Sequence, residues 1–480
     1  MFETLKRNSV PLIVATALFM TNLDATVLST SLPAIARDLG LNPIHLKLAL
    51  TTYLLALAVF IPASGWAADR FGPKNVFRAA MVVFAMGSIF CGLASDLASL
   101  VASRVVQGIG GAMMMPVGRL IVWRSVPKSE IIAAAAWLTI PALMGPVLGP
   151  LLGGFISTYF NWRWIFWINV PVAALGIYLV WRFIPDIRIT EREDFDVKGF
   201  LLVGPGLSMF LTGATLLGLD LVTRETVIVL LLAGAGLMVA YVWHALSVEK
   251  PLIDLRLLRI PTFFAGVMGG FLFRTGIGAA PFLLPLLFQE GFGLTPFQSG
   301  LLIFATGIGS MFMKTQAARI LRRWGYRNVL IANALVAAVF SSLPAFFTAA
   351  TPALLISIIF LSGGLSRSLQ FTGLNTLSFA DVPEEKLSRA TSFASVVQEL
   401  SGAVGVSIAA LALEIIMRID GTTAMTPSIF PPVFLAIAVI SGLSAALFAW
   451  KLDPNAGAVL LVRPGSKPEV AEEKSADAKV

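Results

Sequence analysis

The sequence predicts an all-α polytopic membrane protein with fourteen transmembrane helices. Hydrophobic residues make up 57% of the chain and charged residues only 13%, and the mean hydropathy of +0.85 lies well above that of soluble domains. Apolar runs of about 20 residues, the length that crosses a bilayer, recur along the chain. The basic residues between these runs fall almost entirely on one predicted side.

The apolar runs predict the individual spans. They cover residues 11–33, 46–68, 77–97, 99–123, 131–156, 164–184, 196–217, 225–246, 262–288, 296–318, 327–348, 352–377, 391–417 and 430–451. An even number of spans places both ends of the chain on the same side of the membrane.

The distribution of basic residues sets the orientation. Of the basic residues in the loops and at the span ends, only five fall on the side opposite the termini, namely Arg37, Lys47, Arg163, Arg224 and Arg418. Lysine and arginine concentrate in cytoplasmic loops, so we expect both termini in the cytoplasm. The net charge of +8 then reflects topology, and the scattered basic residues predict no nucleic-acid partner.

Several classes of protein are not supported by the sequence. The first apolar run is long and interrupted by Asp24, so we expect an uncleaved span rather than a signal peptide. Cys91 is the only cysteine, which excludes a disulfide framework. The two histidines, His45 and His244, lie near opposite faces, and there is no phosphate-binding loop. We therefore expect no catalytic residues, no metal site and no cofactor.

Polar stretches divide the chain. We expect an N-terminal six-helix bundle at 1–184, two inserted helices with cytoplasmic linkers at 185–261, a C-terminal six-helix bundle at 262–452 and a disordered cytoplasmic tail at 453–480. A weak repeat supports paired halves, because Gly65–Lys74 and Ala318–Arg327 both follow the second helix of a six-helix unit. Paired halves are the usual architecture of secondary transporters.

The fifth span contains the most informative segment. Within ten residues it holds Gly145, Pro146, Gly149, Pro150, Gly153 and Gly154. Proline removes an amide donor and kinks a helix, and glycine lets another helix approach its backbone closely. A helix of this composition is suited to bending and sliding against a neighbour, which predicts a transporter whose two halves move.

Four motifs in order carry a resemblance to a known family. They are Leu23–Val27 followed by Leu32-Pro33, the loop Gly65–Lys74, the segment Arg104–Gly111, and Gly145–Gly154 followed by Asn161–Phe166 and Asn169–Pro171. Together they resemble the major facilitator superfamily, in particular its fourteen-helix drug:proton antiporter branch of the EmrB/QacA type. The segments Gly110–Pro116 and Arg274–Gly278 resemble the MdtD-like subgroup of that branch.

The resemblance implies a major facilitator fold, with two six-helix bundles plus two inserted helices. It implies a proton-coupled antiporter of the multidrug-efflux type, which exports small organic compounds from a bacterial cell through the inner membrane by alternating access. The expected partners are a small-molecule substrate, protons and the lipid bilayer, with a monomeric protein and no enzymatic activity. Facilitated uptake or symport, and a scaffold or sensor that transports nothing, remain the alternatives.

In this family the first and fourth helices of each half line the cavity, which here means spans one, four, nine and twelve. The charged residues Asp24, Arg104, Arg274 and Arg367 fall on these four spans. The depths of Asp24 and Arg104 differ by only about 6 Å, so an ion pair is possible. We expect these residues, with Gln107 and Gln370, to line the substrate cavity. Helix packing is the alternative role of the two glutamines.

Two carboxyl groups are candidates for proton coupling. Asp24 is the first, with Arg104 modulating its protonation; the alternative is a static ion pair that fixes helix packing. Glu399 in span thirteen is either a second proton carrier or the partner of Arg367. Intramembrane charges are costly and mark ion pathways.

Two segments are predicted to gate the cavity. The first contains Gly65, Asp69, Arg70, Gly72 and Lys74; it is either a latch at the cytoplasmic face or an ordinary tight turn. The second is the glycine–proline segment of span five. Since Arg322 stands where the repeat would place a second aspartate, a symmetric second latch is not expected.

The charge count leaves the substrate open. Three arginines against one clear cavity carboxylate favour an exported organic anion, such as a carboxylate or a metal–carboxylate chelate, because arginine binds carboxylates in bidentate fashion. The resemblance favours multidrug efflux. The inserted helices could shield the cavity from lipid or stabilise the fold.

Overall fold

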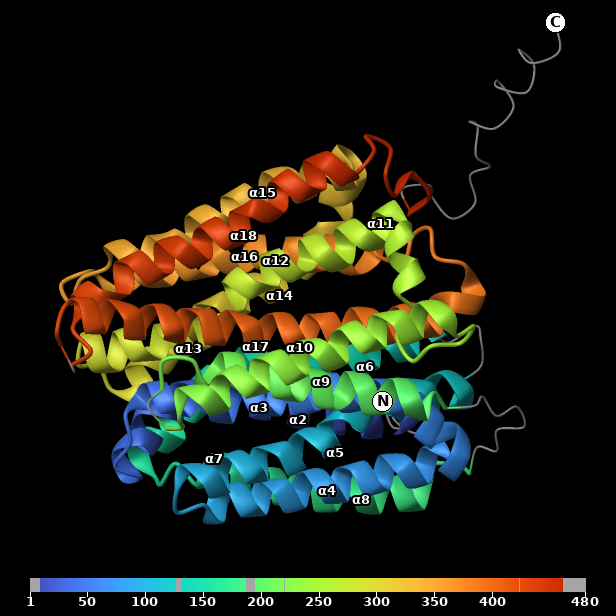
Figure 1. Ribbon diagram of the computed structural model, residues 1–480, viewed down its shortest axis with the longest axis horizontal. Helices are drawn as coiled ribbons and strands as arrows, with labels where there is room; N and C mark the ends of the chain where they lie inside the picture. The colour runs from blue at the N-terminus through green and yellow to red at the C-terminus, as the bar shows by residue number, and fades with distance from the viewer. Residues whose placement is uncertain (1–8, 127–130, 187–194, 220, 423, 461–480) are drawn as a thin grey trace, which may run out of the picture.

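The computed structural model describes residues 9–126, 131–186, 195–219, 221–422 and 424–460. Every regular element among them is helical, and fourteen helical segments are long and apolar enough to cross a membrane (Figure 1). The predicted number of spans and the all-α class are confirmed.

The first half contains the helices up to residue 183. They are α2 (Ser9–Asp38), α3 (Lys47–Phe71), α4 (Pro73–Leu93), α5 (Leu97–Ser125), α6 (Ile131–Tyr159), α7 (Trp164–Trp167) and α8 (Asn169–Phe183), with the 3₁₀ turn η1 (Pro43–Leu46) before α3. The inserted pair consists of α9 (Val197–Leu216) and α10 (Arg224–Ser247).

The second half begins with a composite span. It comprises α11 (Pro261–Phe264), the π-helical turn η4 (Ala265–Gly269), α12 (Gly270–Gly278), α13 (Ala280–Leu286) and the π-helical turn η5 (Leu287–Gly291). Then follow α14 (Pro296–Trp324), α15 (Tyr326–Ser342), α16 (Ala353–Leu377), α17 (Leu387–Ile419) and α18 (Phe430–Lys451). Short 3₁₀ turns lie at η3 (Leu255–Arg259), η6 (Leu343–Phe346), η7 (Glu384–Lys386), η8 (Pro427–Ile429) and η9 (Ala458–Leu460).

The composite span is the main departure from the expected regular helices. A single helix was predicted at 262–288, but the chain forms π-helical turns near both ends of this span. Pro285 lies just before η5 and has no amide hydrogen for the regular helical ladder. π-helical turns inside helices are frequent at functional sites.

The bundle has two faces. We call the end where α2 begins and α18 ends the terminal face, and the other end the opposite face. Near the opposite face, one buried apolar cluster joins the two halves; its members include Leu28 and Leu32 of α2, Phe282 and Leu286 of α13, and Leu302 of α14. We call these five residues the seal.

Near the terminal face, the halves have separate cores. One cluster in the first half surrounds Phe77 and Ile121, and another in the second half surrounds Leu321 and Leu374. The halves therefore pack against one another at the opposite face. Towards the terminal face, the described residues of the two halves share an apolar cluster along the flank where α3 and α17 meet.

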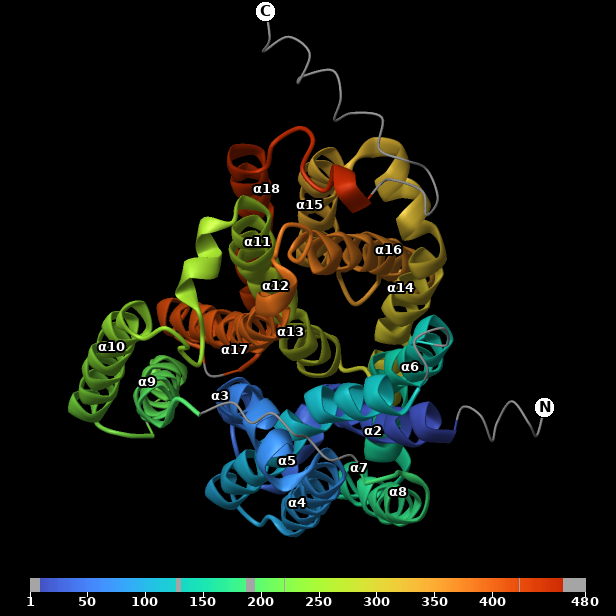
Figure 2. The same ribbon diagram turned by 90° about the vertical axis from the view of Figure 1, so that its right-hand side faces the viewer.

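The inserted pair lies on that flank. Helix α9 packs on α3, α10 and α17, while α10 lies at the rim of the bundle (Figure 2). Towards the opposite face, the Thr215 hydroxyl lies 3.0 Å from that of Ser407 on α17. Lys47 of α3 and Arg418 of α17 donate hydrogen bonds to the carbonyls of Leu217 and Gly218. The inserted pair thus covers the junction of the two halves on its lipid side.

The internal repeat is visible in the backbone. Gly72 ends α3 and precedes α4 with φ +87°, and Gly325 ends α14 and precedes α15 with φ +76°. Only glycine adopts such angles without strain. Each six-helix half therefore makes the same tight turn between its second and third spans.

The segment after α18 differs from the expected disorder in its first part. Residues 453–460 form turns and the short helix η9. Gly457 is buried against Tyr326 and Leu377, so this part of the tail packs on α15 and α16. The rest of the predicted tail lies outside the described residues.

Candidate functional site

Asp24 lies in the middle of α2 and has no solvent-exposed surface. Its Oδ2 accepts a hydrogen bond from Arg104 Nη1 at 2.6 Å. Its Oδ1 accepts bonds from Gln107 Nε2 and from Asn169 Nδ2, each at 2.8 Å. The predicted pairing of Asp24 with Arg104 is thus present, inside a network that joins α2, α5 and α8.

Arg104 is also completely buried. Its Nε donates to the carbonyl of Ala49 at 3.1 Å, and its guanidinium lies 4.1 Å from the centre of the Tyr53 ring. Among the described residues, Arg104 Nη2 has no hydrogen-bond partner. The pair lies within the first half in this conformation and is closed to solvent.

The segment Arg104–Gly111 lets the neighbouring helices come close to α5. A Cβ on Gly108 would lie 2.6 Å from the Cβ of Ala56 on α3, and a Cβ on Gly110 would lie 2.7 Å from the carbonyl oxygen of Ala80 on α4. Glycine at these positions therefore permits the close packing of α5, which carries Arg104, on α3 and α4.

A second charged cluster lies in the other half. Arg274 of α12 is buried and donates from Nη2 to Asn375 Oδ1 of α16 at 2.9 Å. The guanidinium carbons of Arg274 and Arg367 lie 5.2 and 5.5 Å from the centre of the Phe371 ring. Two predicted cavity arginines therefore flank one aromatic ring, at distances that permit cation–π attraction.

Glu399 of α17 belongs to the same cluster. Its charge interacts with that of Arg274, while no ion pair with Arg367 occurs among the described residues. Of the two alternatives for Glu399, pairing with Arg367 is therefore absent in this conformation.

The two predicted cavity glutamines are buried. Gln107 donates to Asp24 and to Ser88. Gln370 accepts from Asn333 Nδ2 at 2.8 Å and donates to the Leu330 carbonyl at 3.1 Å, so it links α16 to α15. In this conformation both glutamines make the helix-packing contacts that were the alternative to cavity lining.

The glycine–proline segment of α6 packs on α2. A Cβ on Gly145 would lie 2.8 Å from the backbone nitrogen of Leu23, and one on Gly149 would lie 2.8 Å from the Cβ of Thr26. The Thr30 hydroxyl donates to the Pro150 carbonyl at 3.2 Å. The helix carries Pro146 and Pro150 without a break, and its glycines allow backbone-to-backbone contact with α2.

The same segment also touches the second half. Gly154 faces the backbone of Phe297 at the start of α14, and Val147 faces Gly307. The amide of Phe297 donates to the Thr158 hydroxyl at 3.0 Å. Helix α6 therefore lies between α2 and α14, beside the seal, where a moving interface between the halves would be.

The predicted loop Gly65–Lys74 lies at the terminal face and is mostly helical, because α3 continues to Phe71 and α4 begins at Pro73, so only Gly72 lies between them. Lys74 Nζ lies 3.7 Å from a carboxylate oxygen of Asp186, Arg70 is exposed and Asp69 is partly buried. Gly72 makes the positive-φ turn, while Gly65 has open space around its Cα. The geometry fits a tight turn that ties the loop to the chain after α8.

Sequence reasoning missed several partners of the charged residues. Asn169, Ser88 and Tyr53 complete the Asp24 network, and Phe371 contacts both arginines. Asn169 carried a signal, since an amide side chain in an apolar run must be hydrogen-bonded. Aromatic residues are too frequent in this chain for Phe371 to stand out.

Comparison with known proteins agrees with this architecture. A family model described as Major Facilitator Superfamily matches residues 14–406 and, in a second match, residues 266–478. A relative from Salmonella paratyphi A, named "Putative multidrug resistance protein MdtD", is 40% identical over 444 residues, which cover 91% of this chain and 93% of that relative. The protein of the same name from Salmonella typhi is 39% identical with the same coverage.

Solved structures share the fold. The D-xylose–proton symporter superposes with a TM-score of 0.67 at 15% identity, over 94% of this chain and 98% of that one. A POT family transporter in complex with 5-aminolevulinic acid gives a TM-score of 0.68 at 14% identity, over 92% and 95%. The expected major facilitator fold is confirmed, and the chain belongs to the major facilitator superfamily as an MdtD-like transporter rather than an enzyme.

Proposed function

We propose that this transporter is a proton-coupled antiporter that exports small organic compounds by alternating access. It would lie in the inner membrane of a bacterial cell, act as a monomer and have both termini in the cytoplasm. The observation that carries the proposal is the fully buried Asp24 carboxylate, held by Arg104 in a bundle whose halves are closed at one face. An intramembrane carboxylate of this kind is costly to bury and marks proton pathways.

The position of the network suggests how coupling works. Three donors stabilise the Asp24 carboxylate, so an incoming proton competes with them for its charge. Opening the opposite face would part α2 and α6 from α13 and α14 at the seal and so give the outer side access towards this network. The proton would enter from that side, and the substrate would leave to it.

The orientation rests on charge. The terminal face carries most of the basic residues that lie outside the spans, and such residues concentrate in the cytoplasm. With the terminal face in the cytoplasm, the seal lies on the outer side, and this conformation faces inward. The loop Gly65–Lys74 would then act as the inner latch when the halves close there.

A second candidate function is export of an organic anion. The observation that favours it is the cluster around Phe371, where Arg274 and Arg367 supply two positive charges and Glu399 one negative charge. Arginine pairs recognise carboxylates in bidentate fashion. In this version Arg274 and Arg367 hold the substrate, and Glu399 is the second candidate for the proton carrier.

Proton release from acid-loaded proteoliposomes tests both versions. Ethidium and succinate would be added outside, and the internal pH followed with a trapped dye. Release driven by ethidium and lost in Asp24→Asn supports drug:proton antiport. Release driven by succinate alone, and lost in Arg274→Gln, supports the anion exporter.

The matched control is Glu225→Gln, which neutralises an exposed carboxylate at the start of α10. It should leave proton release unchanged. If no cation or carboxylate moves protons in the unmodified protein, proton-coupled antiport is wrong. Uptake of substrate with protons, rather than against them, would identify a symporter.

A further inference from the structure

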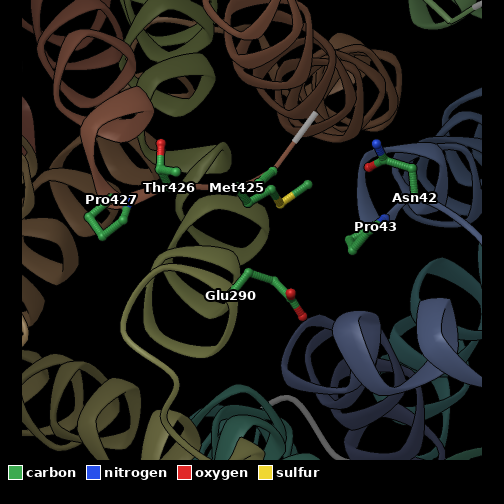
Figure 3. Close-up of a pocket in the computed structure, with 7 residues that line it drawn as sticks. Asn42, Pro43, Glu290, Met425, Thr426 and Pro427 are labelled. Atoms are coloured by element: carbon green, nitrogen blue, oxygen red, sulfur yellow. The ribbon is translucent and has the colours of Figure 1, made fainter. Parts of the chain in front are cut away.

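A separate cavity of about 530 Å³ opens on the opposite face, where the two halves meet (Figure 3). The first half contributes the residues at the start of η1, and the second half contributes η5 and the loop between α17 and α18. Its walls include Asn42, Pro43, Glu290, Met425, Thr426 and Pro427. The cavity lies outside the seal and shares no residue with the Asp24 network or the Phe371 cluster.

Glu290 is the only charged residue on these walls. It belongs to the π-helical turn η5, and its carboxyl group extends away from its own helix towards the first half (Figure 3). Within the described part of the chain, Glu290 Oε1 is shielded from solvent and has no hydrogen-bond partner. A buried acceptor is costly to leave without a donor, most of all when it is charged, so a donor ligand that reaches this carboxyl group gains from pairing with it.

The other polar groups of the cavity are also able to accept hydrogen bonds. Asn42 Oδ1 accepts one bond, from the amide of Ile44 at 3.0 Å, and a carbonyl oxygen has a second lone pair. The Thr426 hydroxyl lies 2.9 Å from that of Ser428. Pro43, Met425 and Pro427 supply apolar wall between these groups.

We propose that this cavity binds organic ammonium ions that carry an apolar body. The ammonium group would donate to Glu290, and to Asn42 or Thr426, while the body contacts the methionine and proline walls. A volume of about 300–1,000 Å³ is typical of small-molecule sites. Anions are disfavoured, because the lining contains a carboxylate and no basic residue.

The charge and accessibility of the cavity can be tested without any transport assay. Cys91 is buried and is the only cysteine, so Met425→Cys in a Cys91→Ser background places one reactive thiol in the cavity wall. Two membrane-impermeant methanethiosulfonates of opposite charge, the trimethylammonium and the sulfonate reagent, would be compared. We expect the ratio of the cationic to the anionic rate to be about tenfold higher than the ratio for a small thiol in solution, since Glu290 attracts the cationic reagent.

Glu290→Gln should abolish this preference, whereas Asp96→Asn, which neutralises an exposed carboxylate at the N-terminus of α5, should keep it. Phenethylammonium should slow modification by either reagent, and the neutral analogue 2-phenylethanol should not. A rate ratio no higher than that of the small thiol, a preference that survives Glu290→Gln, or protection by the alcohol as strong as by the amine would each overturn the proposal. The protection experiment needs no substitution at Glu290 and so remains decisive if that variant does not fold.

Discussion

The pair Asp24–Arg104 places two opposite charges where neither has solvent contact. Removing one partner of a buried pair leaves the other uncompensated, which costs about 3–5 kcal/mol. We therefore expect Asp24→Asn and Arg104→Gln each to lower the thermal stability of the purified protein markedly. The double variant should recover much of that loss, because no unpaired charge remains. Thermal unfolding in detergent, analysed as a double-mutant cycle, measures the recovery.

Transport by the same double variant separates the two roles of Asp24. If the pair is static, restored stability should bring transport back with it. If Asp24 carries the proton, the double variant folds and binds substrate but no longer moves substrate against a gradient. A double variant that is as unstable as the single ones would contradict the buried-pair argument itself.

At the scale of elements, the contact between α6 and α2 depends on glycine. A Cβ at position 145 would lie 2.8 Å from the backbone nitrogen of Leu23, and a backbone atom cannot rotate away. We expect Gly145→Ala to cost about 1–3 kcal/mol, the usual range for overpacking. Gly236→Ala on α10 is the control, because nothing lies within 4 Å of its added methyl group. Equal melting temperatures for the two variants would show that α6 and α2 separate without cost.

The linkers of the inserted pair are held together by Asp196, just before α9. Its carboxylate accepts hydrogen bonds from the amides of Gly199 and Leu252 at 2.8 and 3.1 Å, and it pairs with His244 Nε2 at 2.8 Å. Burial opposes the charged form, but these hydrogen bonds outweigh it and hold the pKa of Asp196 below its usual value. The stabilisation is therefore complete above about pH 4 and is lost as the pH falls through the lowered pKa.

Hydrogen exchange of residues 248–254 should report this loss. We expect protection of the segment to fall on acidification below about pH 4 in the unmodified protein. In Asp196→Asn, which can still cap α9, protection should be lower at neutral pH and should change little with acid. A wild-type profile that is flat down to pH 3 would show that Asp196 does not hold the linkers.

At the scale of the whole molecule, the sequence predicted the number of helices and the pairing of Asp24 with Arg104, because both follow from local rules. Span length is set by the bilayer, and an intramembrane charge must find a partner. It did not predict the π-helical turns η4 and η5 or the interaction between the charges of Glu399 and Arg274. These features depend on how helices far apart in the sequence pack against one another. The same holds for the burial of Gln370 against α15 and for the packing of α9 over the α3–α17 junction. The functional division at residues 184 and 262 stays a prediction.

The last prediction concerns the motion of the two halves as rigid bodies. Thr158 of α6 and Phe297 of α14 are hydrogen-bonded across the junction beside the seal. In a Cys91→Ser background, we expect a short bifunctional thiol reagent to link Thr158→Cys to Phe297→Cys and to abolish transport reversibly, since rigid-body opening requires the halves to part there.

The matched control links Ser31→Cys to Ser157→Cys, whose native hydroxyls are 2.8 Å apart within the first half. That link should leave transport intact. If both links stop transport, α2 and α6 move relative to one another during the cycle, and the first half is not a rigid body. If neither does, the opposite face does not open by separation of α6 from α14.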